Sequence, residues 1–361
     1  MKIYINGRFL TQSLTGVQRY ASEVVKQIDL MLEKNLIDNN IYKFILVTPN
    51  DKLNNLNLKH IKIKSVGKLK GHLWEQFELP FFCKDGILLS LCNVGPVLKR
   101  NQLVTIHDAA VYAVPDTFSF SFRIWYQILL RLLGKVSKKI ITVSNFSKKE
   151  LIKYAKINEK KIKVIYEGAE HILNNNHDYS ILEKHHLKKR GYVLAVSSLN
   201  PRKNFKTLIK AFKEPILNNL NLDFVIAGPK PEKLFAKIKN FENKDFKYLG
   251  YVTDSELRTL YENALCFVYP SLYEGFGIPP LEAMLCGCPV IVSNQTSLPE
   301  ICGNKALQCN PMDSNDIAKK ILLIYSNDEL RKKLIIDGKT HARNFSWSSC
   351  TKELIKELIN L

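Results

Sequence analysis

Two carboxylates bracket a short glycine-containing loop in the second half of the sequence. Glu274 belongs to the string EGFG, directly after the apolar run 266–269, and Glu282 follows it by eight positions. One carboxylate can reach ribose hydroxyls and the other the hydroxyls of a sugar, because ionised carboxylates accept hydrogen bonds. The spacing of two glutamates is weak evidence by itself, and Glu282 could equally be an ordinary residue on a helix surface. The loop between them contains Gly275, Phe276 and Gly277.

This loop leads into an expected helix whose first turn contains Pro279 and Pro280. Proline is favoured at the start of a helix, where the first backbone N–H groups have no partner within the helix. Those N–H groups and the helix dipole favour a bound anion. The sequence therefore predicts an anion site at the N-terminus of this helix.

Further candidate site residues follow two of the strands expected in the first half. Gly16 opens a helix after the first strand, and its lack of a side chain would let a phosphate or a sugar approach the backbone, although a plain turn is the alternative. Arg19, one turn along this helix, could face either a ligand or solvent. His107 and Asp108 follow the strand 103–106. A histidine there can hydrogen-bond a hydroxyl or assist proton transfer, or it can be structural with both nitrogens satisfied.

Short β-rich runs alternate with helical patterns along the sequence, which is typical of the α/β class with parallel sheets. In the first half we expect strands at 2–5, 42–48, 60–66, 87–91, 103–106, 139–143 and 162–165, and helices at 16–31, 72–78, 120–136 and 147–154. In the second half we expect strands at 192–197, 223–227, 247–249, 266–269 and 290–293, and helices at 205–212, 255–264, 279–286, 316–325, 328–343 and 349–359.

A stretch with three consecutive asparagines and scattered charge interrupts this alternation, so we expect a linker at 171–190. It separates a first doubly wound domain at 1–170 from a second at 191–345. The remaining helix, within 346–361, is expected to pack back on the first domain. In such folds ligands bind beyond the carboxyl ends of the strands, so the residues after the strands should line a cleft between the domains.

The composition is that of a folded protein with two domains: 361 residues, of which 46% are apolar and 24% charged. The net charge of +19 is uneven, because 1–190 holds 31 basic and 16 acidic residues while 191–361 holds 22 and 18. This favours an anionic partner such as nucleic acid, a membrane surface or a phosphorylated substrate, although a lysine-rich composition without a role is the alternative. We expect no signal peptide and no membrane span. The eight cysteines have neither disulfide nor zinc-site spacing and should be reduced.

The string EGFGIPPLEAMLCGCPVIVSN, followed by SLPEICG, strongly resembles the nucleotide-sugar loop of retaining family 4 glycosyltransferases of the GT-B fold. Further segments match in the expected order over nearly the whole chain: NGRFL, TGVQRYASEVV, TIHDAAV, ITVSNFSKKEL, VIYEG, SLNPRKNFKTLIKAF, IAGPK, YLGYVTDSELRTLYENA and FSW. The resemblance implies two Rossmann-like domains, the first binding an acceptor and the second a nucleotide sugar. It also implies retaining transfer of a hexose-type sugar, from GDP-mannose or a UDP-sugar to a glycan, in cell-surface polysaccharide (O-antigen) synthesis.

The resemblance also implies roles for cations after the strand 192–197. Lys203 matches a family lysine that contacts the donor diphosphate, although a plain surface charge is the alternative. The arginine that many members carry five positions earlier is replaced here by Ser198. The adjacent Arg202 could supply the missing guanidinium or face solvent, and the difference matters because only a guanidinium binds a diphosphate in a bidentate manner.

Other implied roles concern the reacting sugar. His107 would lie beside it, with Asp108 and Arg19 on the acceptor side, while Gly16 and the glycine loop would approach the donor. Cations and N–H dipoles can stabilise charge that develops on a leaving diphosphate. No Asp-x-Asp metal motif stands out, and the resemblance implies that neither a metal nor another cofactor is needed. His107, Lys203 and Glu274 are thus the candidate catalytic residues.

Basic and apolar segments of the first half suggest a membrane partner. The lysines are Lys59, Lys62, Lys64, Lys68 and Lys70, and the apolar segment is 118–139, which includes Trp125 and Tyr126. We expect a cytoplasmic protein, peripheral on an anionic membrane, with a polyprenyl-diphosphate-linked acceptor. A buried helix and solvated lysines are the alternative.

Three other functions stay open at this point. A nucleic-acid-binding protein would explain the charge, but we find none of the usual motifs and expect no nucleic acid. Another GT-B enzyme, such as an epimerase or a phosphorylase, is the second alternative. A non-catalytic partner of a transferase is the third.

Overall fold

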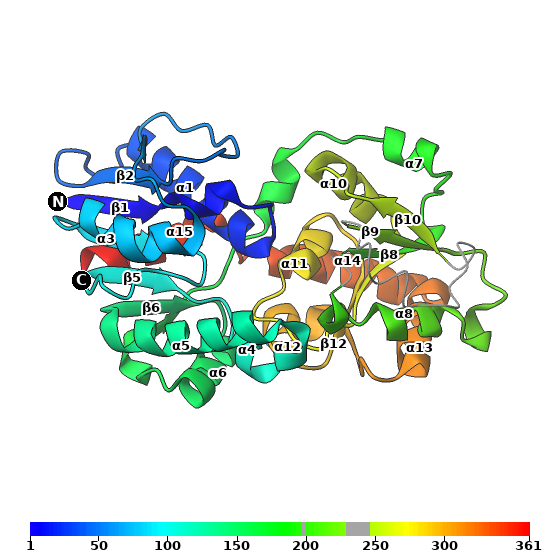
Figure 1. Ribbon diagram of the computed structural model, residues 1–361. Coiled ribbons are helices and arrows are strands. Elements are labelled where there is room, and N and C mark those ends of the chain that lie inside the picture. Colours follow the sequence, from blue (N-terminus) through cyan, green and yellow to red (C-terminus); the bar gives the residue numbers. More distant parts are fainter. Residues whose placement is uncertain (197–199, 229–245) are drawn as a thin grey trace. The chain divides into compact units, whose positions relative to one another are not determined.

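The computed structural model describes residues 1–196, 200–228 and 246–361. These residues form two compact units, Met1–Gly168 with Trp347–Leu361, and Ala169–Ser346. Each unit is built on one parallel sheet with helices packed against it (Figure 1). The expected α/β class with two doubly wound domains is therefore confirmed.

The first unit contains a seven-stranded sheet in the order β3-β2-β1-β4-β5-β6-β7. Its strands are β1 (Lys2–Asn6), β2 (Lys43–Thr48), β3 (Lys62–Ser65), β4 (Ile87–Ser90), β5 (Gln102–Thr105), β6 (Lys139–Thr142) and β7 (Ile162–Val164). The strand order reverses direction beside β1, which pairs in parallel with both β2 and β4. Such a reversal is where an open α/β sheet binds ligands, beyond the carboxyl ends of the strands.

Helices cover both faces of this sheet. They are η1 (Gly7–Thr11), α1 (Gly16–Glu33), α2 (Gly71–Leu73), η2 (Trp74–Glu78), α3 (Leu79–Phe82), α4 (Ala110–Ala113), η3 (Pro115–Thr117), α5 (Phe120–Val136), α6 (Asn145–Ala155), η4 (Glu159–Lys161) and α15 (Trp347–Ile359). Right-handed crossovers place α1 on one face and α3, α5 and α6 on the other, because the order runs away from β1 in opposite directions. α15 packs beside α1, where the rings of Tyr20 and Trp347 are 5.9 Å apart.

The helix expected at 72–78 is longer and contains a π-helical turn. It runs without a break through α2, η2 and α3, and the Leu79 N–H donates to the Trp74 carbonyl five residues earlier. Pro80 follows directly and cannot donate to the carbonyl four residues before it, which favours the wider turn. Sequence periodicity gave no sign of this turn.

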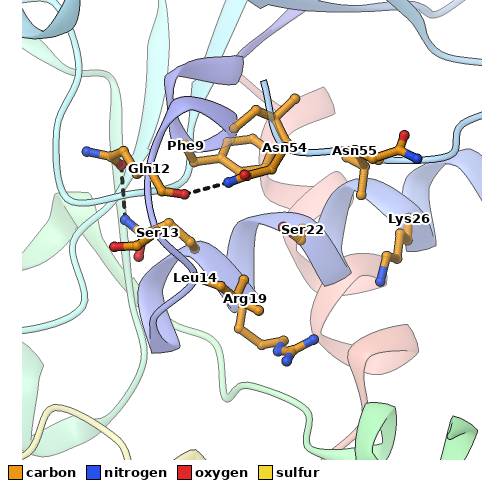
Figure 2. A pocket seen from close by; sticks show the side chains of 12 residues that line it. Phe9, Gln12, Ser13, Leu14, Arg19, Ser22, Lys26, Asn54 and Asn55 are labelled. Carbon is orange, nitrogen blue, oxygen red and sulfur yellow. Dashed lines mark hydrogen bonds between the residues drawn. The ribbon is translucent and has the colours of Figure 1, made fainter. Parts of the chain in front are cut away.

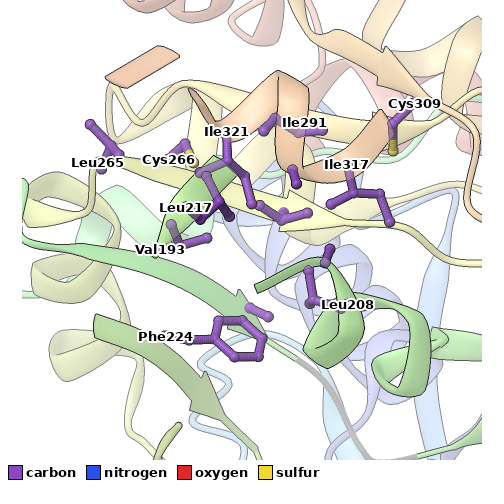
Figure 3. Close-up of a cluster of buried hydrophobic side chains, with 14 of the residues drawn as sticks. Val193, Leu208, Leu217, Phe224, Leu265, Cys266, Ile291, Cys309, Ile317 and Ile321 are labelled. Atoms are coloured by element: carbon purple, nitrogen blue, oxygen red, sulfur yellow. The ribbon is translucent and has the colours of Figure 1, made fainter. Parts of the chain in front are cut away.

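The second unit contains a six-stranded sheet in the order β10-β9-β8-β11-β12-β13. Its strands are β8 (Tyr192–Val196), β9 (Asp223–Ala227), β10 (Lys247–Gly250), β11 (Cys266–Tyr269), β12 (Val290–Ser293) and β13 (Leu307–Cys309). The helices are η5 (Glu170–Asn174), α7 (Ser180–Lys184), η6 (Pro201–Lys203), α8 (Phe205–Phe212), η7 (Pro215–Leu217), α10 (Asp254–Asn263), α11 (Ile278–Leu285), α12 (Leu298–Cys302), η8 (Gly303–Lys305), α13 (Ser314–Ser326) and α14 (Asp328–Ala342). Apolar residues from the strands interlock with those of α8 and α13, including Val193, Leu208, Phe224 and Ile321 (Figure 3).

The segment 171–190, which we expected to be a linker, packs within the second unit. Arg258 on α10 donates from Nη1 to the carbonyls of Leu173 and Asn175 at 2.8 and 2.7 Å. The Asp178 N–H donates to Thr259 Oγ1 at 3.0 Å. The segment thus consists of the short helices η5 and α7 with turns between them, anchored by hydrogen bonds to α10.

All eight cysteines carry free thiols, and seven of them are buried. Burial raises the pKa of the Cys83, Cys302 and Cys309 thiols to about 12. In the part of the chain that the structure describes, no helix combines the length and apolar character needed to cross a bilayer.

Candidate functional site

An ion pair joins two of the predicted site residues in the second unit. Lys203 Nζ lies 2.6 Å from Glu274 Oε1 and also donates to the Tyr269 hydroxyl. Both charged side chains are largely buried. Burial alone would raise the pKa of Glu274, but the charges of Lys203 and Arg202 outweigh it and hold this pKa below its ordinary value. Glu274 is therefore an ionised acceptor at neutral pH.

The short helix η6, which carries Arg202 and Lys203, is fixed to the loop that carries Glu274. The Leu272 N–H donates to the Arg202 carbonyl at 2.7 Å. Asn204 adopts the left-handed conformation, with φ of 60°, and its Nδ2 donates to the Pro270 carbonyl at 3.2 Å. An asparagine tolerates this backbone and supplies the amide, so a single residue both ends η6 and anchors it.

The glycine loop after β11 is held by two hydroxyl side chains. Ser297 Oγ donates to the carbonyls of Glu274 and Phe276 at 3.0 and 2.7 Å, and the Glu274 N–H donates to Thr296 Oγ1 at 3.3 Å. Gly277 has φ of 121°, and a Cβ there would lie 2.8 Å from Leu298 Cδ2. Only glycine fits this position without strain.

The predicted anion site at the start of α11 has few backbone donors within the helix itself. α11 begins at Ile278, so Pro279 and Pro280 occupy its next two positions. Neither proline has a backbone N–H. The donors that remain at this end are few, and an anion there must rely on the loop N–H groups and on cations from η6.

Glu282 is a buried residue of α11 and not the surface residue of the alternative interpretation. Its Oε1 lies 2.9 Å from His171 Nε2, and the Tyr261 hydroxyl donates to its Oε2 at 3.3 Å. Sequence reasoning gave His171 no role, because it falls in the segment that we expected to be a linker. Ser198, the departure from the family pattern, lies outside the described residues.

His107 lies in the first unit, at the end of β5, with both ring nitrogens occupied. Nδ1 is 2.9 Å from Glu167 Oε1, and Nε2 is 2.9 Å from the Leu91 carbonyl. The Leu91 carbonyl only accepts, so Nε2 carries an N–H group, and the Glu167 carboxyl occupies the other ring nitrogen. Burial alone would lower the pKa of His107, but the contacts with Glu167 and Leu91 raise it. Asp108, the next residue, accepts from the Ala110 N–H at 2.9 Å.

Gly16 and Arg19 lie near the start of α1. Gly16 is exposed, and a Cβ built on it would meet no atom within 4 Å. Arg19 lines a cavity of about 290 Å³ between α1, the residues before it and the segment 54–56 (Figure 2). Across this cavity's lining, Asn54 Nδ2 donates a hydrogen bond to the Gln12 carbonyl at 2.6 Å. The side chain of Arg19 thus faces this hollow of the first unit.

The structure therefore groups the predicted residues by unit. In the second unit Arg202, Lys203, Glu274 and the loop Gly275–Gly277 form one site, with Glu282 on the helix behind it. In the first unit His107 and Asp108 follow β5, while Gly16 and Arg19 begin α1. Sequence reasoning gave no functional role to Glu167, Tyr269 or Ser297.

Comparison with known proteins gives consistent findings. Residues 178–341 match the family described as Glycosyl transferases group 1. The O-antigen chain mannosyltransferase B of Escherichia coli is 32% identical over 268 residues, which cover 72% of this chain and 70% of that protein. The O-antigen chain mannosyltransferase RfbU of Salmonella typhimurium is 36% identical over 219 residues, covering 60% and 58%. A sucrose-phosphate synthase of Thermosynechococcus elongatus superposes with a TM-score of 0.76 over 99% of both chains at 15% identity, which shows a common fold.

Proposed function

This chain belongs to the group 1 glycosyl transferases and is a glycosyltransferase of the GT-B fold, and from that premise we propose that it transfers mannose from GDP-mannose to a glycan. Transfer retains the anomeric configuration and builds a cell-surface polysaccharide such as an O-antigen. The names of the two relatives support mannose as the sugar. The observation that carries the proposal is the Lys203–Glu274 pair, which places a cation and an ionised acceptor at one loop.

The donor binds to the second unit. Arg202 and Lys203 contact its diphosphate, and Glu274 accepts from a hydroxyl of the transferred sugar. Glu282 accepts from the ribose hydroxyls. The cations stabilise the charge that develops on the leaving diphosphate, so no metal or other cofactor is required for this role. Transfer should accordingly persist in excess EDTA.

Proton transfer in the retaining reaction uses the donor itself. The acceptor hydroxyl attacks from the face that the diphosphate leaves, and an oxygen of the diphosphate takes its proton. The arrangement of His107 supports this route, because both of its ring nitrogens are engaged, by Glu167 and by the Leu91 carbonyl, and neither is free to accept a proton from the acceptor. His107 then contributes a fixed positive charge at the end of β5.

The acceptor is a polyprenyl-diphosphate-linked glycan, and the protein binds peripherally to the cytoplasmic face of an anionic membrane. Support comes from the face of the first unit that carries α3 and α5. Exposed apolar side chains on these helices and the turns before α3 include Leu73, Phe77, Phe81, Phe82, Phe120, Trp125, Ile128 and Leu132. We call this set the apolar face. Large exposed apolar surfaces on monomeric proteins often mark a binding site.

Basic residues flank the apolar face, although fewer than the sequence suggested. Lys68, Lys84 and Arg131 are exposed close to it in sequence. Lys59 and Lys70 instead form ion pairs with Glu33 and Asp51, at 2.8 and 3.1 Å. Each unpaired basic residue near an anionic bilayer contributes about 1 kcal/mol, so apolar insertion must supply much of the binding.

A donor panel tests the proposed activity. The purified protein is incubated with GDP-mannose, UDP-glucose, UDP-galactose or UDP-N-acetylglucosamine, and nucleotide release and thermal stabilisation are measured. We expect GDP-mannose alone to give both signals, and NMR of the product to show the axial anomeric configuration of the donor. Selective response to a UDP-sugar would exclude mannose transfer, and an inverted product would exclude retention.

A further inference from the structure

The cavity beside α1 is lined by cations and by uncharged polar side chains that the proposed donor site does not use. Its volume is about 290 Å³, at the lower end of the range of about 300–1,000 Å³ for small-molecule sites. Arg19, Ser22 and Lys26 line it from α1, where a spacing of three and four residues puts them on one face of the helix (Figure 2). Asn54 and Asn55 line it from the segment between β2 and β3.

The charges around this cavity are arranged unevenly. Arg19 Nη1 and Lys26 Nζ lie 3.9 and 2.8 Å from the same atom, Glu23 Oε1. The Glu23 side chain is only 7% exposed, whereas those of Arg19 and Lys26 are 18% and 47% exposed. Among the described residues that line the cavity, these two are basic and none is acidic. The buried carboxylate offsets one of the two positive charges, and the cavity itself presents cations to a ligand.

Hydrogen bonds fix the two walls of the cavity relative to each other. The Asn54 N–H donates to the Leu10 carbonyl at 2.7 Å, in addition to the contact of its side chain with the Gln12 carbonyl. Farther along the same segment, the Asp29 carboxylate of α1 accepts from the backbone N–H groups of residues 59–61, each at 2.8 Å. Walls that are already in place lose less conformational freedom when a ligand binds.

The rest of the lining is suited to a sugar ring. Ser22 supplies a hydroxyl and Asn55 an amide, and both groups can donate and accept hydrogen bonds. The buried side chains of Phe9 and Leu56 add apolar surface for C–H groups. A guanidinium, in contrast, binds a carboxylate or a phosphate through two parallel hydrogen bonds. The cavity therefore combines groups that recognise a sugar with groups that recognise an anion.

The position of the cavity indicates which part of an acceptor reaches it. Leu14 and Gln18, on either side of Gly16, both line the cavity, so its ligand lies near the backbone that we expect a phosphate or the reacting sugar to approach. The cavity borders α1, on the opposite face of the sheet from α3 and α5, which carry the apolar face. A lipid diphosphate stays beside the bilayer at the apolar face. A negative charge in the cavity therefore belongs to a sugar of the glycan.

We propose that this cavity binds an acidic sugar of the acceptor glycan, a pyranose that carries a carboxylate or a phosphate. Arg19 and Lys26 bind the anionic group, while Ser22 and Asn55 hydrogen-bond the ring hydroxyls. The inference rests on the proposed function, in which a glycan accepts the transferred sugar. It adds the class of that glycan, which is one with negatively charged residues.

The test compares charged sugars with their neutral counterparts on the whole chain, without a donor. Methyl α-D-glucuronide and methyl α-D-galacturonide supply the carboxylate, glucose 6-phosphate supplies the phosphate, and methyl α-D-glucoside and methyl α-D-galactoside are neutral. Titrations followed by saturation-transfer NMR should show at least one charged sugar binding at least tenfold more tightly than its neutral counterpart. Added salt should weaken this binding. Equal binding of the neutral sugar, equally tight binding of acetate or inorganic phosphate, or no binding of any charged sugar would overturn the proposal.

Substitutions locate the bound sugar. Arg19→Ala should weaken binding of the charged sugar at least tenfold and Lys26→Ala at least fivefold. Lys34→Ala, an exposed cation directly after α1 that does not line the cavity, should bind the sugar as the wild type does, and so should Lys203→Ala in the donor site. Lys26 is exposed, so Lys26→Ala decides the matter even if Arg19→Ala lowers the melting temperature. Loss of binding in Lys203→Ala alone would place the sugar in the donor site and refute the proposal.

The donor panel described above separates this inference from the proposed function. A protein that binds the charged sugar through Arg19 and Lys26 but responds to no nucleotide sugar would keep the cavity as an acidic-sugar site and refute the transferase proposal. A protein that responds to GDP-mannose but binds charged and neutral sugars equally would keep the transferase and refute the acidic-sugar site.

Discussion

Lys203 Nζ and Glu274 Oε1 lie 2.6 Å apart, so the two residues proposed to bind opposite ends of the donor's reacting bond contact each other directly. A diphosphate that approaches Lys203 competes with Glu274 for the same ammonium. The carboxylate that loses part of this contact becomes available to a sugar hydroxyl. Donor binding and the release of Glu274 are thus coupled through one charge.

Glu274→Gln should reduce transfer at least a hundredfold, because a neutral amide neither holds the sugar hydroxyl as strongly nor balances Lys203. Retained activity within a few-fold of the wild type would remove Glu274 from the site. The free energy of unfolding should fall by about 1–3 kcal/mol, since a buried charged hydrogen bond is weakened. Kinetic assays and urea unfolding measure the two effects. Glu262→Gln, which breaks a comparable pair with Arg258 and His177 in the same unit, is the control and should stay active.

Arg202→Ala and Lys203→Ala should each weaken GDP binding by about 1.5–3 kcal/mol, the range for hydrogen bonds to charged groups. Isothermal titration calorimetry measures this directly. Lys210→Ala, an exposed cation on the adjacent α8, should bind GDP normally. If Arg202→Ala also binds normally, then Lys203 alone contacts the diphosphate and Arg202 does not replace the arginine that is absent at Ser198.

Gly16→Ala should leave the free energy of unfolding unchanged or raise it by up to about 1 kcal/mol, because alanine is the better helix former and its Cβ would contact no protein atom. Transfer should nevertheless fall at least tenfold if a phosphate or sugar approaches this backbone. The KM for GDP-mannose and the melting temperature are measured together. An active Gly16→Ala protein would show that the glycine only begins α1.

The predictable and the unpredictable parts of this molecule differ in physical origin. The sheets could be predicted because their buried strands are continuous apolar runs bounded by turn residues, and the expected strands 223–227, 266–269 and 290–293 match the observed β9, β11 and β12 residue for residue. The ion pairs could not, because Glu167 and His107, or His171 and Glu282, are far apart in sequence. Periodicity carries no information about such partners. The prolines that mark the start of α11 also lack the N–H groups that would bind an anion, so the role of this helix end stays a prediction.

The stability of the protein should depend on pH through His107. Its pKa is raised above the ordinary 6.5, so the folded state binds this proton more tightly than the unfolded state. That stabilisation is complete below pH about 6.5 and is lost as the pH rises through the raised pKa of the folded state. Urea unfolding between about pH 6 and pH 9 should show the decline. Glu167→Gln should flatten it, and an equal slope in both proteins would show that His107 does not titrate as argued.

Membrane binding should require the apolar face. Co-sedimentation with vesicles of phosphatidylglycerol should be strong at low salt and should weaken with added salt, while phosphatidylcholine vesicles bind less. The double variant Phe77→Ser and Phe81→Ser should lose most of this binding without loss of stability, because both side chains are exposed. Leu323→Ser, an exposed apolar residue of the second unit, is the control. Negligible sedimentation of the wild type with both lipids would favour a soluble acceptor.

The partnership of α15 with α1 orders events during synthesis of the chain. Residues 169–346 leave the ribosome after the whole seven-stranded sheet but before Trp347, and the second compact unit consists of these residues alone. In the first unit, by contrast, the side of Tyr20 that packs against Trp347 stays exposed until α15 has been synthesised. The earlier-made unit is therefore the later to finish its core. A nascent chain stalled before Trp347 should expose apolar surface on α1 that chaperones bind. A chain truncated at that point should lose stability in the first unit, although the missing residues are at the C-terminus.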